Sequence, residues 1–212
     1  MQVYIISKCI NKSLLTAAIL AVLYVATVFA TCRKNCSQTN YSFEIGAKAY
    51  PDLDSIRVGD TVWIEVDEPV LLKNQNTNAN VQFYGAVNLG TVISFIELEG
   101  NQLLANAAND FDLTLKKGLF VGNSTVPNLL REYLFVEENN AYVFKLGVIA
   151  QRAGIFRIGL SDAANVYRKG EECSKATFRI NFKESNQHMY LNEQNFGVSM
   201  PLPNSSYCFK VK

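Results

Sequence analysis

The sequence predicts an all-β fold, an antiparallel β-sandwich preceded by an N-terminal hydrophobic signal helix. Apolar residues alternate with polar residues at period two in roughly ten short segments, which turn residues separate. The 10 Tyr and 13 Phe, together with many Val, Ile and Thr, favour a half-buried pleated backbone over helices. A small β-barrel is the alternative architecture, because periodicity alone does not separate the two.

The predicted strands follow one another along the whole chain after residue 40. Gly59-Asp60 supplies a turn before one of them, and Trp63 in that strand is expected to lie in the core. Helix is predicted only for two short pieces, Gln102–Ala108 and Asn128–Tyr133. The segments that alternate are Tyr41–Ile45, Thr61–Val66, Val81–Tyr84, Thr91–Leu98, Phe111–Leu115, Tyr133–Val136, Tyr142–Ile149, Ile155–Leu160, Ala176–Phe182 and Tyr207–Val211.

The best-defined unit runs from Glu132 to Leu160. Tyr133–Val136 and Tyr142–Ile149 are predicted to form a hairpin, because the intervening Asn139 and Asn140 tolerate the positive φ angles of such a turn. A second turn at Gln151–Gly154 leads into the next strand.

This second turn supports a more specific fold. Ala153-Gly154-Ile155-Phe156 resembles the late-strand corner of immunoglobulin-like sandwiches, in which an aromatic residue follows a turn glycine. The resemblance implies an immunoglobulin-like β-sandwich whose first strand runs beside and parallel to a late strand.

The N-terminus has the layout of an export signal. Lys8 and Lys12 precede the uncharged run Leu14–Ala30, which as a helix would reach about 26 Å. That length is marginal for a membrane span of about 30 Å and suits the apolar core of a signal peptide. Val28-Phe29-Ala30 offers a cleavage site, which would give a secreted chain beginning at Thr31.

A second interpretation of the junction is lipidation at Cys32. Phe29-Ala30-Thr31-Cys32 resembles the lipobox of bacterial lipoproteins, although Phe29 and Thr31 depart from the usual residues. The junction Thr31-Cys32-Arg33-Lys34, with the later segment Ile56–Trp63, resembles uncharacterised exported lipoproteins of Bacteroidetes-type bacteria. The resemblance implies a place in the cell envelope and no particular activity. An uncleaved membrane anchor is the third possibility.

The domain organisation follows from this junction. Residues 1–31 are expected to be a signal peptide or lipoprotein leader, residues 32–40 a tether, and residues 41–212 a single sandwich domain. Beyond the leader, basic and acidic residues nearly balance, which argues against a nucleic-acid partner. The membrane, reached through lipid or the signal anchor, is the expected partner.

Four cysteines, Cys32, Cys36, Cys173 and Cys208, follow the leader in an oxidising compartment. In an immunoglobulin-like sandwich, Cys36 and Cys173 would lie at one end of the sheet, each just before one of the two parallel strands. The resemblance therefore implies a Cys36–Cys173 disulfide, with Cys173–Cys208 as the alternative. Cys208 alternates with Tyr207 and Phe209, which predicts an outward-facing thiol.

The sequence contains no convincing catalytic signature. His188 is the only histidine, so a nucleophile–histidine arrangement would have to use it, and histidine-rich metal sites are excluded. We assign no catalytic or metal-binding residue and expect no cofactor, because phosphate-binding loops and dinucleotide fingerprints are absent. The carboxylates that could pair for glycoside hydrolysis are Asp52 with Asp54, Glu65 with Asp67 and Glu68, Asp110 with Asp112, and Glu137 with Glu138.

Together these features indicate an exported cell-envelope protein, an outer-membrane or surface lipoprotein with a non-catalytic binding or structural role. Its partner would be an envelope protein or a glycan. Exposed aromatic residues could stack on sugars, and Phe83-Tyr84 and Tyr190 are the candidates. The alternatives are a secreted carboxylate-dependent hydrolase and a glycan-binding accessory domain.

Overall fold

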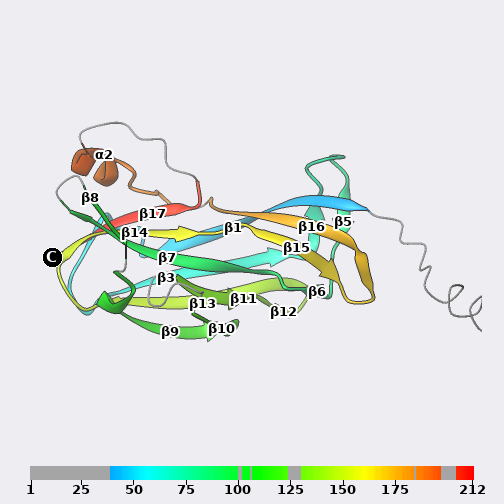
Figure 1. Cartoon of the computed structure of the whole chain (residues 1–212), viewed down its shortest axis with the longest axis horizontal. Helices are drawn as coiled ribbons and strands as arrows, with labels where there is room; N and C mark the ends of the chain where they lie inside the picture. The colour runs from blue at the N-terminus through cyan, green and yellow to red at the C-terminus, as the bar shows by residue number, and fades with distance from the viewer. Residues whose placement is uncertain (1–38, 100–101, 106, 124–129, 184, 197–203) are drawn as a thin grey trace, which may run out of the picture. The chain divides into compact units, whose positions relative to one another are not determined.

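The computed structural model describes residues 39–99, 102–105, 107–123, 130–183, 185–196 and 204–212. The chain divides into two units, Met1–Ser37 and Gln38–Lys212, and the account below concerns the second. This unit is built almost entirely from strands (Figure 1), which confirms the predicted all-β fold. Among the residues described, no helix has the length and apolarity needed to cross a membrane.

The first sheet has eight strands in the order β12-β13-β3-β1-β16-β15-β6, with β9 also paired to β13. Its long central strands alternate buried and less buried residues, as a sheet with one covered face requires. The strands are β1 (Asn40–Tyr50), β3 (Thr61–Pro69), β6 (Ala86–Val87), β9 (Phe111–Lys117), β12 (Val136–Glu138), β13 (Ala141–Ala150), β15 (Ala163–Arg168) and β16 (Glu171–Phe182).

The second sheet has seven strands in the order β10-β11-β7-β14-β17-β2, with β8 also paired to β7. Outside both sheets lie a two-stranded ribbon, the 3-10 helix η1 (Ala107–Asp110) and the helix α2 (Tyr190–Phe196). The ribbon pairs β4 (Leu71–Lys73) with β5 (Asn80–Gln82). The sheet strands are β2 (Ser55–Ile56), β7 (Gly90–Glu99), β8 (Gln102–Ala105), β10 (Leu119–Asn123), β11 (Leu130–Leu134), β14 (Gly154–Leu160) and β17 (Ser206–Val211).

Strand β1 runs parallel to β16, as predicted for a first strand beside a late one. The register pairs Asn40 with Lys175 and continues without interruption to Ala47 with Phe182. A hydrogen bond of 3.1 Å from the Lys175 amide to the Thr39 carbonyl extends the ladder by one residue. The pairing places the N-terminal strand in the interior of the first sheet, where both of its edges are occupied.

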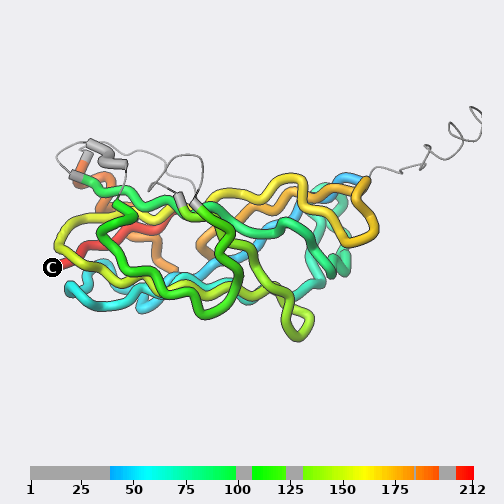
Figure 2. Tube along the Cα trace, turned by 60° about the horizontal axis from the view of Figure 1, so that its bottom comes forward, coloured from blue at the N-terminus to red at the C-terminus, as the bar shows by residue number. Residues whose placement is uncertain are grey.

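The core lies between the two sheets and joins them into one hydrophobic cluster. Phe43 and Phe178 contribute from the first sheet, and Phe156 and Phe209 contribute from the second. Phe83, which follows the ribbon, packs on Phe43 and Phe178 with ring centroids 5.1 and 5.5 Å apart. Figure 2 shows the chain tracing back and forth along the length of this core.

The predicted hairpin turn is confirmed, but one of its strands differs from the prediction. Asn139 and Asn140 have φ angles of 51° and 62° in the turn between β12 and β13. Residues 130–134 instead form β11 and pair with β7 in the second sheet. The chain changes sheet at Phe135, whose amide donates to the Leu89 carbonyl at 2.9 Å. A period-two pattern that continues through such a crossing gives no sign of it.

The described residues of the two predicted helical pieces form strands, except that Ala107 and Ala108 at the end of the first begin the 3-10 helix η1. Residues 106, 128 and 129 lie outside the described ranges. Gln102–Ala105 is strand β8, paired with β7, and β11 begins at Leu130. Among the described residues, the α-helix that forms is α2. The sequence did not predict it, because a helix of seven residues shows barely two turns of periodicity.

The prediction that Trp63 lies in the core is also wrong. Its neighbours Val62 and Ile64 fill the inner face of β3, so Trp63 lies on the outer face of the first sheet. There its ring covers Gly147 of β13, and the Lys145 ammonium sits 5.4 Å from the ring centroid. The glycine leaves the space that the indole occupies.

This contact predicts the effect of Gly147→Ala. A Cβ atom at Gly147 would lie 2.9 Å from Cζ3 of Trp63, so the indole must move away from the sheet. We expect the free energy of unfolding to fall by about 1 kcal/mol. Because Trp63 is the only tryptophan, its fluorescence emission should shift to longer wavelength as the ring becomes more hydrated. Unchanged emission in a folded Gly147→Ala variant would contradict this packing.

Candidate functional site

Of the cysteines considered in the sequence analysis, the structure describes Cys173 and Cys208. Cys32 and Cys36 lie outside the described residues, so lipidation at Cys32 and a Cys36–Cys173 disulfide remain predictions. Cys173 is not a free thiol, and Cys208 is free, which excludes the alternative Cys173–Cys208 disulfide in this structure. Cys173 lies two residues before Lys175, the partner of Asn40, and therefore near the start of β1.

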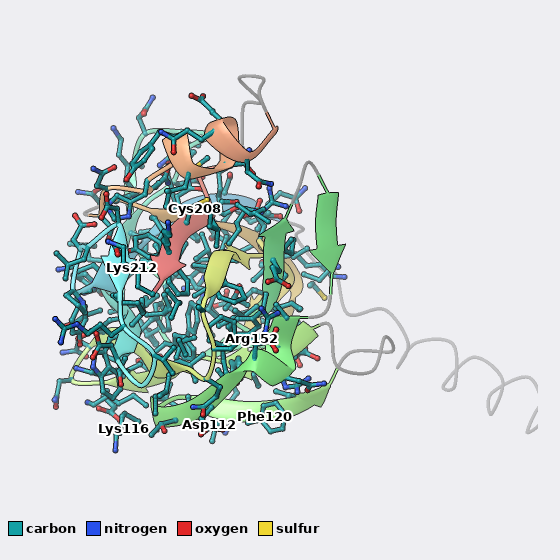
Figure 3. All side chains as sticks on the ribbon, turned by 90° about the vertical axis from the view of Figure 1, so that its left-hand side faces the viewer. Asp112, Lys116, Phe120, Arg152, Cys208 and Lys212 are labelled. Carbon is teal, nitrogen blue, oxygen red and sulfur yellow. The ribbon has the colours of Figure 1, made fainter. Side chains whose placement is uncertain are left out.

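Cys208 faces away from the main core, as its alternation with Tyr207 and Phe209 predicts, but it is fully buried. Leu98 of β7 and Leu191 of α2 pack against it, and Figure 3 shows Cys208 beneath the helix. Burial raises the pKa of the Cys208 thiol to about 11. The outward exposure expected from the sequence is wrong because the missed helix covers this face of the second sheet.

The burial of Cys208 predicts slow alkylation of the folded protein. At pH 8 a thiol with a pKa of about 11 has roughly one part in a thousand as thiolate, and α2 further blocks the reagent. We expect iodoacetamide to modify Cys208 only after unfolding in guanidinium, as measured by peptide mass spectrometry. Rapid modification under native conditions would show that α2 does not cover the thiol.

His188 joins the segment before α2 to the rest of the domain. The ring is buried, its Nδ1 lies 3.1 Å from the Cys208 carbonyl oxygen, and its Nε2 lies 3.5 Å from Oδ1 of Asp52. The ring also packs on Tyr207, with centroids 5.4 Å apart. Both nitrogens thus face oxygen acceptors of the protein, so neither is directed at a hydroxyl or thiol nucleophile.

The carboxylates noted in the sequence are engaged mainly in structural contacts. Asp52 accepts the Asn186 amide, and Asp54 accepts the Tyr190 hydroxyl. Glu65 accepts the Tyr50 hydroxyl at 2.5 Å and lies 3.3 Å from the Lys145 ammonium. Burial acts to raise the pKa of Glu65, but these two hydrogen bonds outweigh it and leave the pKa below its ordinary value. Glu138 pairs with Lys117.

Asp110 and Asp112 do not form an isolated acid pair either. Arg152 bridges Asp110, at 2.8 Å, and Glu97 of β7, whose two oxygens it contacts at 2.6 and 2.7 Å. Asp112 accepts a hydrogen bond from Gln151. Figure 3 shows Arg152 and Asp112 on the side of the domain that carries the C-terminus. Within the described ranges, no group of three metal-ligating side chains comes together.

The Arg152 bridge predicts a loss of stability in Arg152→Gln. The Glu97 side chain is only 13% exposed, and the variant would remove the guanidinium that contacts both of its oxygens. We expect the free energy of unfolding to fall by about 1–3 kcal/mol in urea titrations at neutral pH. Lys116→Gln, at an exposed position of β9, is the matched control and should change stability by less than about 0.5 kcal/mol. Equal stability of the two variants would contradict the bridge.

An open cleft of about 500 Å³ lies beside the ribbon, and we call it the Tyr84 cleft. Its polar side chains come from separate elements: Gln82 from β5, Glu137 from β12 and Asn140 from the turn before β13. The exposed fractions of Tyr84 and Leu71 are 58% and 54%. The lining residues are Pro69, Val70, Leu71, Gln82, Tyr84, Glu137 and Asn140.

Hydrogen bonds hold the walls of the Tyr84 cleft together. The Val70 amide donates to the Asn140 carbonyl at 2.9 Å, and the Phe83 amide donates to the Val70 carbonyl at 2.8 Å. The Gly85 amide donates to Oε2 of Glu137 at 2.6 Å, and the Tyr142 hydroxyl donates to the Phe83 carbonyl. These bonds connect the end of β3, the residues after β5 and the β12–β13 hairpin, so the cleft is preformed.

The two residues of the dipeptide Phe83-Tyr84 lie in different places, one in the core and one at the surface. Phe83 is fully buried in the aromatic cluster, and the next residue, Tyr84, is directed outward into the cleft. The prediction of an exposed aromatic at this dipeptide therefore applies to Tyr84 alone. Tyr190, the other candidate, is 40% exposed on α2, where its hydroxyl is bonded to Asp54. The contributions of Gln82 and Asn140 were missed, because they are distant in sequence from each other.

A second cleft, of about 620 Å³, lies around Pro51, Arg57 and Lys212. Its lining includes no aromatic side chain and mixes Arg57, Asp60 and Lys212. Asp60 is already bonded to the Arg57 amide at 2.9 Å. The Tyr84 cleft is therefore the better candidate site, because it combines an exposed ring with amide side chains on a preformed frame.

Comparisons with known proteins leave the function open. No family model matches the sequence, and no curated protein matches it. Among solved structures, the reeler domain of human F-spondin is 10% identical, with a TM-score of 0.37 over 85% of this chain and 96% of that domain. A conjugative transposon lipoprotein from Bacteroides eggerthii is 18% identical, with a TM-score of 0.27 over 65% of this chain and 96% of that one. At these TM-scores neither likeness carries an argument.

Proposed function

We propose that this protein is a lipid-anchored protein of a bacterial cell envelope with a non-catalytic binding role. The leader-like N-terminus and the junction at Cys32 support export and lipidation. The single observation that carries the binding role is the preformed Tyr84 cleft, which presents an exposed ring and two amide side chains on a rigid frame.

The geometry of the first strand suits a short tether. β1 begins at Asn40, eight residues after Cys32, so the intervening chain can span at most about 30 Å. The start of β1 and the ribbon lie toward the same end of the domain (Figure 1), and the Gln75 amide joins them by donating to the Ser42 carbonyl. α2 lies toward the other end.

We infer that the two sheets form an immunoglobulin-like sandwich rather than a small barrel. The separate strand orders of the two sheets and the parallel pairing of β1 with β16 support this classification. The turn at Gln151–Gly154 carries the chain from β13 in one sheet to β14 in the other, as a sandwich corner does.

A binding role is favoured over a carboxylate-dependent hydrolase. Asp52, Asp54, Glu65, Asp110 and Glu138 each hold a hydrogen bond or ion pair to a neighbouring element. Glu137 reaches the Tyr84 cleft, but one of its oxygens accepts the Gly85 amide. No second carboxylate is among the residues that line this cleft, whereas glycoside hydrolysis requires two.

The anchor is tested by the full-length chain expressed in a Bacteroidetes-type host. Wild-type protein should incorporate labelled fatty acid and show the corresponding increase in intact mass, and Cys32→Ser should lose both. Cys36→Ser is the matched control and should keep the lipid, because only the residue at the junction is modified. A lipid-free wild-type protein beginning at Thr31 would instead establish a secreted domain and overturn the lipid anchor.

A further inference from the structure

The Tyr84 cleft has a chemical character that points to a particular class of ligand. An exposed tyrosine ring presents a face of partial negative charge, onto which the C–H bonds of a pyranose ring can pack. With 58% of the residue exposed, such stacking needs no rearrangement of the protein. Leu71 and Pro69 add apolar surface beside the ring.

The polar groups of the cleft match hydroxyl groups. The amides of Gln82 and Asn140 each supply two donor hydrogens and an acceptor oxygen, so each can bond an O–H group in either direction. Glu137 offers Oε1 as a further acceptor, while its Oε2 is held by the Gly85 amide. Donors and acceptors beside one aromatic face are what a sugar ring with several hydroxyls requires.

The charges that line the Tyr84 cleft further restrict the class of carbohydrate that it can bind. The lining contains one carboxylate and no Lys, Arg or His. An anionic ligand would meet Glu137 without a compensating cation, which disfavours sulfated or uronic-acid glycans. A neutral sugar pays no such penalty.

We propose that the Tyr84 cleft binds a neutral carbohydrate by stacking on Tyr84 and hydrogen bonding to Gln82, Asn140 and Glu137. This inference rests on the proposed role as an exported binding protein and names the class of its ligand. Because Phe83 and the hydrogen bonds around it hold the walls in place, little ordering is required on binding.

The test uses the full-length protein, purified in detergent, on an array of immobilised neutral, amino and acidic glycans. We expect the protein to bind the neutral glycans on the array. The affinity is then measured by electrophoresis in gels that contain a soluble neutral polysaccharide of the same linkage. Tyr84→Ala should weaken binding at least tenfold, equivalent to about 1.4 kcal/mol. Gln82→Leu should weaken it about threefold, because one hydrogen-bonding side chain is lost.

The matched control is Tyr190→Ala, which removes the other candidate tyrosine from α2 and should leave binding unchanged. Asn140→Asp keeps a residue that tolerates the φ angle of 62° and exchanges the amide for a carboxylate, so it should also reduce binding. Thermal unfolding of each variant shows whether it is folded. Tyr84→Ala should unfold at nearly the wild-type temperature because its ring is mostly exposed.

Three results would overturn the proposal: no binding to any glycan, binding only to acidic or amino glycans, or wild-type binding by folded Tyr84→Ala. Lipid attachment is measured on the same preparations. Failure of glycan binding in a lipidated protein would reject the ligand class and leave the anchor intact, whereas a lipid-free protein that binds glycans would reject the anchor alone.

Discussion

The parallel pairing of β1 with β16 is the constraint on which the rest of this domain depends. It joins residues more than a hundred positions apart and places Phe43 directly opposite Phe178 in the ladder. The two rings pack with centroids 5.1 Å apart, and Phe83 packs against both of them. Because β1 lies between β3 and β16, the same pairing also fixes its direction within the first sheet.

The candidate site depends on the packing of Phe83 against Phe43 and Phe178. After Phe83, which lies in the aromatic cluster, the chain reaches the surface at Tyr84 and bends at Gly85, where φ is 65°. The Gly85 amide then meets Glu137, and the Phe83 carbonyl meets the Tyr142 hydroxyl, so the β12–β13 hairpin closes the opposite wall. The burial of Phe83 and these hydrogen bonds thus shape the Tyr84 cleft at the surface, although the groups involved have structural roles. A ligand would bind to side chains that the core has already oriented.

The sequence predicts the strands well because burial on one face imposes a period of two. It also predicts the Asn139-Asn140 turn, because few other residues tolerate positive φ. Periodicity does not show whether the outer face of a sheet is covered by another element, such as a helix. Trp63 was therefore predicted to lie in the core, but it lies on the outer face of the first sheet. Cys208 was predicted to be exposed, but its thiol lies beneath α2. The residues of the Tyr84 cleft come from positions 69 to 140 and meet through tertiary structure. From the sequence, only its aromatic dipeptide and, as a candidate acid, Glu137 were therefore named.

The most direct test of the account is the register of β1 on β16. Ser42 and Thr177 are paired residues on the outer face of the first sheet, and neighbouring strands lie about 4.8 Å apart, within the range that a disulfide bridges. The full-length Ser42→Cys, Thr177→Cys variant should form this disulfide on mild oxidation, as shown by peptide mass spectrometry. The shifted pair Ser42→Cys, Arg179→Cys should remain largely unlinked. Preferential linkage of the shifted pair, or none in the first, would contradict the parallel pairing and the placement of Phe83 and Tyr84 that follows from it.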